Sequence, residues 1–117
     1  MTSSFKANFH GIEREFSFLV TSYDSNDNMA VLLVEDNGEP YATATVNFDF
    51  LCPGCAYVDD NNLPGIGKLL QKNGFAKPLG AKRHSGFVDY SLYEFDLEAM
   101  KDYILPSSDY FMVQFSA

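Results

Sequence analysis

The stretch that most constrains the fold is residues 29–50, which has the pattern of a β-hairpin. Its first arm, 29–34, is apolar on both faces, as expected for a strand that is covered on both sides. Its second arm, 41–50, alternates apolar and polar residues with the period of two of a half-buried strand. Between them, Asn37-Gly38 tolerates the positive φ angles of a type I′ turn, so the two arms are predicted to pair antiparallel.

Further strands are predicted from the same alternation. They are residues 5–10, 13–21, 85–95 and 110–115, with a shorter one that begins at Ala56 and runs into a polar loop. Because these strands adjoin through short turns, without the long helices of parallel sheets, the predicted fold class is α+β. We expect a single domain over residues 1–117, with one antiparallel sheet of about five or six strands and two short helices.

The two helices are predicted from apolar spacing and from their ends. The first begins near Pro64 and ends at Asn73-Gly74, a pair typical of a left-handed helix C-terminus. The second covers residues 97–104, where Asp96 is the expected N-cap and Pro106 stops the segment. Residues 75–83 lie between these helices and are predicted to be a basic loop.

The size and ends of the chain set the general class. A chain of 117 residues buries roughly two-thirds of its unfolded surface and needs no disulfide or metal to fold. No apolar run approaches the roughly 18 residues of a membrane helix, and the N-terminus lacks the apolar segment of a secretory signal. We therefore expect a cytoplasmic protein with no membrane partner, in which Cys52 and Cys55 are thiols.

The net charge of −8 is unevenly distributed along the chain. Residues 15–60 contain nine acids and no Lys or Arg. Five of the eight basic residues follow in a stretch that has no acid between positions 61 and 88. This balance disfavours direct binding to nucleic acid, because a phosphate backbone attracts cations. It favours either simple solubility or a basic partner.

Three short motifs each resemble a known functional motif but lack part of it. The Cys52-Pro53-Gly54-Cys55 sequence resembles a redox pair, but a strand rather than a helix is predicted after it, so we interpret it as a turn. The spacing of Asp24, Asn26 and Asn28 resembles a calcium loop but lacks its central glycine and its flanking helices. Gly65 and Gly67 lack the remaining residues of a phosphate-binding loop. We therefore predict no metal and no cofactor.

Several sequence runs resemble a family of short, uncharacterised bacterial proteins carried on conjugative plasmids and transposons, known as a domain of unknown function. The resemblance covers roughly residues 29 to 96. The runs are Tyr41-Ala42-Thr43-Ala44-Thr45-Val46-Asn47, the stretch from Ala56 to Ile66, the stretch from Asn73 to Gly80, and the stretch from Ser85 to Phe95. The resemblance implies a cytoplasmic setting and an origin on a mobile element, and it supplies no catalytic residues to assign to this chain.

Three classes of function are compatible with these features. The first is a non-enzymatic inhibitor of anti-CRISPR or anti-restriction type, whose acids occupy the basic surface of a nucleic-acid-binding protein. The acids predicted to form this partner-binding site are Glu35, Asp36, Glu39, Asp59 and Asp60. The second class is a thiol redox protein that uses the two cysteines. The third is a small-ligand protein whose pocket is lined by Tyr41, Tyr57, Tyr90 and Tyr93, although an aromatic core explains those tyrosines equally well.

Overall fold

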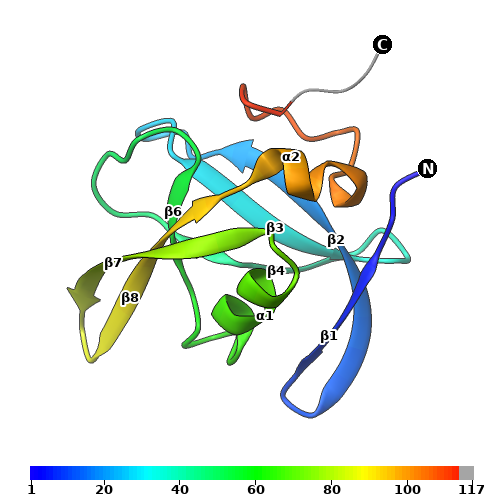
Figure 1. The fold of residues 1–117 in the computed structure, drawn as a ribbon, viewed down its shortest axis with the longest axis horizontal. Helices are drawn as coiled ribbons and strands as arrows, with labels where there is room; N and C mark the ends of the chain where they lie inside the picture. The colour runs from blue at the N-terminus through cyan, green and yellow to red at the C-terminus, as the bar shows by residue number, and fades with distance from the viewer. Residues whose placement is uncertain (114–117) are drawn as a thin grey trace.

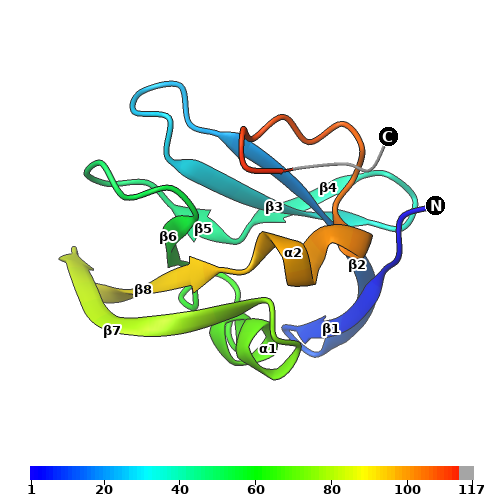
Figure 2. The same ribbon diagram turned by 45° about the horizontal axis from the view of Figure 1, so that its top comes forward.

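The computed structural model describes residues 1–113 and contains two four-stranded antiparallel sheets (Figures 1 and 2). The first sheet has the order β1 (Phe5–Phe9), β2 (Ile12–Ser22), β3 (Met29–Glu35) and β4 (Pro40–Thr43). The second has the order β5 (Thr45–Val46), β6 (Cys55–Val58), β8 (Val88–Phe95) and β7 (Ala76–Ser85). The α+β class and the antiparallel pairing are confirmed. The prediction of one sheet with five or six strands is corrected to eight strands in two sheets.

The two sheets arise because the chain changes sheet at Ala44. The Ala44 amide donates to the carbonyl of Val31 at 2.7 Å, and the Ala44 carbonyl accepts from the amide of Asp59 at 2.9 Å. Ala44 therefore joins β3 of the first sheet to the end of β6 in the second, and its side chain is fully buried. The predicted arm over 41–50 is thus two short strands, and Phe50 lies beyond them with 73% of its surface exposed.

The tight turns differ from the predicted assignment. In the turn between β3 and β4 only Gly38 has a positive φ, of 88°, and Asn37 does not. The Gly38 amide donates to the Glu35 carbonyl and the Glu35 amide to the Glu39 carbonyl, which is a type I turn with a glycine bulge. The predicted type I′ turn was therefore wrong here. That geometry occurs between β1 and β2, where His10 and Gly11 both have positive φ.

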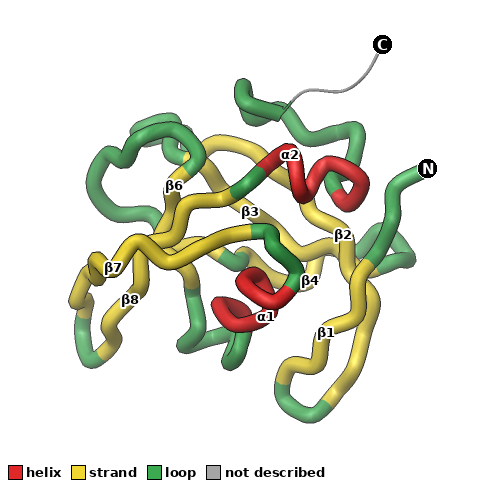
Figure 3. The backbone as a smooth tube through the Cα atoms, in the orientation of Figure 1, coloured by secondary structure: helices red, strands yellow, loops and turns green. Residues whose placement is uncertain are grey.

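The predicted basic loop over 75–83 is instead most of β7, a ten-residue edge strand (Figure 3). Proline is tolerated at a sheet edge because no neighbour requires its missing N–H. The pairing of β7 with β8 shifts register between Pro78 and Lys82, and Gly80 lies in this irregularity with a φ of 85°. The strand resumes and turns at Gly86-Phe87, so the predicted strand 85–95 is mainly β8.

The two predicted helices are present. Helix α1 (Ile66–Lys72) lies between the edge strands β7 and β1, and Gly74 follows it with a φ of 72° (Figures 1 and 2). Helix α2 (Leu97–Met100) has Asp96 as its N-cap and continues into a 3-10 turn, η1 (Lys101–Tyr103). No helix among residues 1–113 has the length and apolar character to cross a bilayer.

The predicted last strand is not seen where the structure describes it. Residues 110–113 form turns and irregular backbone. The remainder of that prediction, 114–115, lies outside the described residues.

One hydrophobic core joins the two sheets and the helices. Its fully buried members include Phe16 and Phe18 from β2, Leu33 from β3, Leu70 from α1 and Met100 from α2. Aromatic contacts reinforce it, because Phe18 and Phe75 meet edge to face with their ring centroids 5.3 Å apart. This shared core fixes the positions of the surface loops that carry the candidate sites.

Candidate functional site

The acids of the turn between β3 and β4 differ in their surroundings. Asp36 and Glu39 are exposed. Glu35 is partly buried, with 19% of its side chain exposed, and it pairs with Arg14 at 2.6 Å. Arg14 also lies over the ring of Tyr41, 5.5 Å from its centroid. Glu35 therefore anchors the turn against β2, whereas Asp36 and Glu39 face solvent.

Strand β2 contributes two more acids next to this turn. A shallow depression is lined by Lys6, Glu13, Arg14, Glu15, Glu35 and Asp36. Glu13 and Glu15 are both exposed, and Lys6 is the cross-strand partner of Glu15. We call Glu13, Glu15, Asp36 and Glu39 the acidic rim. Glu13 and Glu15 were not among the predicted site residues, although their spacing of two on a predicted strand already placed them on one face.

The predicted acids of the loop after β6 belong to a different part of the fold. Asp59 is buried, with 6% of its surface exposed, and its carboxylate accepts from the amide and the side chain of Asn62 at 3.0 and 2.8 Å. Asp60 is exposed, but one of its oxygens accepts from the amide of Gly67 at 3.0 Å. Both acids thus stabilise the loop and the start of α1. Figure 1 shows this loop apart from the turn between β3 and β4.

The two cysteines occupy the predicted turn. Both are free thiols; Cys52 is exposed and Cys55 is buried at the start of β6. The Cys55 amide donates to the Cys52 carbonyl, and the Gly54 amide donates to the hydroxyl of Tyr110. Burial raises the pKa of the Cys55 thiol, and Glu94 and Cys52 add to this effect. A raised pKa disfavours the thiolate that disulfide exchange requires.

The structure brings together only two of the four tyrosines that were predicted to line a ligand pocket. Tyr41 packs on Phe9 and Phe16 in the first sheet. Tyr57 and Tyr90 both contact Phe48, with ring centroids 5.5 Å away in each case. Tyr93 is buried in the core, where its hydroxyl accepts from the side chain of Gln71 at 3.1 Å. The structure therefore brings Tyr57 and Tyr90 together at Phe48, while Tyr41 and Tyr93 make other contacts.

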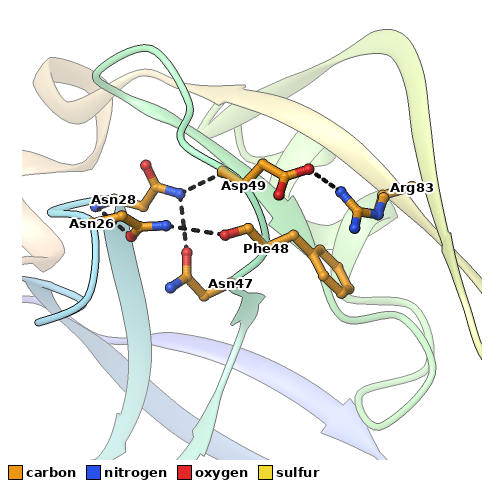
Figure 4. A network of polar contacts seen from close by, with 6 residues as sticks. All are labelled: Asn26, Asn28, Asn47, Phe48, Asp49 and Arg83. Carbon is orange, nitrogen blue, oxygen red and sulfur yellow. Dashed lines mark hydrogen bonds and ion pairs between the residues drawn. The ribbon is translucent and has the colours of Figure 1, made fainter.

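The polar loop that resembled a calcium site is held by protein groups. The buried Asn28 side chain donates to Asn47 and to the Asp49 carbonyl, and Asn26 donates to the Phe48 carbonyl (Figure 4). These bonds fasten the loop before β3 to the loop after β5. Within residues 1–113 no group of three or more His, Cys, Asp or Glu side chains is arranged to hold a metal ion.

Comparison with protein families adds one match. The family model "Domain of unknown function (DUF4313)" matches residues 17–115, from within β2 to beyond the last described residue. No curated protein and no solved structure matches the chain. The predicted resemblance to a domain of unknown function is thereby confirmed, over a longer stretch than residues 29–96.

Proposed function

Because the chain belongs to the DUF4313 family, which is defined without a function, we propose a function from its surface: a non-enzymatic module that binds a basic protein through the acidic rim. The observation that carries this proposal is the exposure of Asp36 beside Glu13 and Glu15, with Glu39 exposed on the same turn as Asp36. Exposed charge of one sign attracts a surface of the opposite sign and aligns it during encounter.

The charge of the rim is not cancelled within the part of the chain that the structure describes. The ion pairs there involve Glu35, Asp49, Asp89, Glu94 and Glu98 as the acids. None of the four rim acids takes part in those pairs. Lys6 and Arg14 lie nearby, but Arg14 is engaged by Glu35. The rim therefore retains most of its negative charge for a partner.

The partner class follows from the chemistry of such a surface. A protein site that binds nucleic acid is rich in Lys and Arg, and clustered carboxylates compete for it as the phosphates do. The resemblance to proteins of mobile elements implies a setting in the bacterial cytoplasm. In that setting the natural target class is a defence protein, such as a CRISPR effector or a restriction enzyme. The action proposed is inhibition by occupation of that site.

Affinity capture from a bacterial lysate tests this proposal. The tagged parent is compared with the variant Asp36→Lys/Glu39→Lys and with Lys68→Glu/Lys72→Glu, which reverses two exposed charges on α1. We expect the parent and the α1 variant to retain a basic nucleic-acid-binding protein, identified by mass spectrometry, and the rim variant to lose it. Equal recovery by all three proteins would contradict the proposal.

Inhibition needs its own measurement. The captured partner is assayed for nucleic-acid binding by fluorescence anisotropy with and without the parent protein. We expect the parent to displace the nucleic acid and the rim variant to do so much less. If the partner binds the parent protein and nucleic acid simultaneously, the proposed binding function stands but competitive inhibition is contradicted.

A further inference from the structure

A cavity of about 750 Å³ opens beside α2, away from the acidic rim. Its walls come from four parts of the chain: the end of α1, the paired ends of β7 and β8, the segment from α2 to Ile104, and residues 112–113. Figure 2 shows α2 directly following β8 at this place. The volume lies in the range of roughly 300–1,000 Å³ that is typical of small-molecule sites.

The inner wall of the cavity is apolar. Ala76, Phe95 and Ile104 are buried, with 7%, 4% and 3% of their surfaces exposed, and each also belongs to the hydrophobic core. Leu97 and Val113 are half-buried and pack against that core from the outer side. These side chains are held by the fold, so an apolar ligand would meet a largely pre-formed surface and would displace water from it.

The charged side chains lie around this apolar wall and are largely paired with one another. Lys77 pairs with Glu94 at 3.3 Å, and Lys101 pairs with Glu98 at 2.8 Å. Asp96 is the remaining acid of the lining, and one of its oxygens accepts from the Ala99 amide as the N-cap of α2. Three acids and two lysines give the lining a net charge of −1, and the unbalanced charge is that of Asp96.

We infer that this cavity binds a small molecule with an apolar body and one positively charged amine, the amine lying near Asp96. An anionic group that approached Lys77 or Lys101 would be repelled by the glutamate with which each lysine is paired. The amide that Asp96 caps is likewise already satisfied. A cation meets no such competition, and it would complete the charge balance of the lining.

A matched set of probes tests the inference: phenylbutylamine, phenylbutanol and phenylbutyrate, which share one apolar body and differ in charge. Each is titrated into the isotopically labelled full chain, and amide chemical shifts are followed by NMR. We expect saturable shifts centred on Ala76, Leu97 and Ile104, with the amine bound most tightly and the carboxylate least. Binding in the reverse order, or no saturable shifts at these residues at millimolar probe, would overturn the inference.

Two variants separate charge from shape. Asp96→Asn keeps an N-cap acceptor but removes the negative charge, so it should weaken amine binding roughly two- to fivefold, the size of an exposed ion pair. It should leave the binding of phenylbutanol unaffected. Asp102→Asn makes the same chemical change at an exposed residue of η1 outside the lining. It should alter the binding of neither the amine nor the alcohol. Equal weakening of amine binding by both variants would show that Asp96 does not hold the amine.

Discussion

Gly67 lies directly against the hydroxyl of Tyr93. A Cβ placed on this helical glycine would come within 2.4 Å of the Tyr93 oxygen and 2.8 Å of Asp60 Oδ2. Both distances are shorter than nonbonded contacts allow. The glycine therefore has a packing role, in which α1 approaches β8 closely enough for Gln71 to donate to the same hydroxyl.

Replacement of this glycine should destabilise the fold although alanine is the better helix former. For Gly67→Ala we expect the gain of about 1 kcal/mol in helix propensity to be outweighed by overpacking, with a net loss of about 1–3 kcal/mol in the free energy of unfolding. Urea denaturation measures the loss. In Gly67→Ala/Tyr93→Phe the nearest clash is removed, so the two losses should not add; strict additivity would contradict the packing role.

The same substitution should destabilise the protein at Asp59 and have little effect at Asp36. Asp59→Ala removes the acceptor for the amide and side chain of Asn62 in a buried position, and we expect it to cost about 1–3 kcal/mol of unfolding free energy. Asp36→Ala changes an exposed side chain and should stay within about 0.5 kcal/mol. The midpoints of urea denaturation give both values. Equal stability of the two variants would mean that the Asp59 carboxylate does not hold the loop.

The sequence predicted individual elements well because their signals are local. The apolar run of β3, the alternation of β2 and the cap at Asp96 depend on neighbouring residues alone, and each appears as expected. The change of sheet at Ala44 depends instead on Val31 and Asp59, which are 13 and 15 positions away in the printed sequence. No periodicity within the strand contains that information, so a continuous arm was predicted.

In the candidate site too, features set by the local sequence were predictable and features set by tertiary contacts were not. Exposure of Asp36 and Glu39 follows from their place in a turn, which the sequence contained. The burial of Asp59 and the pairing of Glu35 with Arg14 are tertiary contacts, and composition gives no sign of them. For β7, Pro78 and Gly80 indicated a loop, because the sequence does not reveal that the strand would lie at an edge, where both residues are tolerated.

The two cysteines should differ in reactivity. Burial, then Glu94 and Cys52, raise the pKa of Cys55, so its thiolate is scarcer near neutral pH than that of a free thiol. We expect iodoacetamide to modify the exposed Cys52 faster, on the order of tenfold, in the folded protein. Mass spectrometry of peptides at timed intervals measures both rates, and denatured protein serves as the control. Faster modification of Cys55 would contradict this prediction and favour a thiol redox protein that uses the two cysteines.

The same pKa shift affects stability at alkaline pH. The folded-state pKa of Cys55 lies above its unfolded value, so its contribution is fully present below about pH 8.5. This contribution is lost as the pH rises through the folded-state pKa. Cys55→Ala removes the titrating group, and its unfolding free energy should therefore decline less steeply above pH 8.5 than that of the parent. Identical pH profiles would show that the thiol does not titrate differently on folding.

The acidic rim makes a kinetic prediction for any partner recovered by capture. Long-range attraction accelerates encounter, and it weakens as the Debye length shortens to about 8 Å at physiological ionic strength. Association measured by surface plasmon resonance should therefore slow as salt is raised, while dissociation changes less. Asp36→Lys/Glu39→Lys should slow association and flatten its salt dependence, because it reverses two of the four rim charges. Lys68→Glu/Lys72→Glu should change both quantities much less, since these lysines lie on α1, outside the rim. If the association rate is insensitive to salt, or if the two variants behave alike, the rim does not guide the partner and its charge serves only solubility.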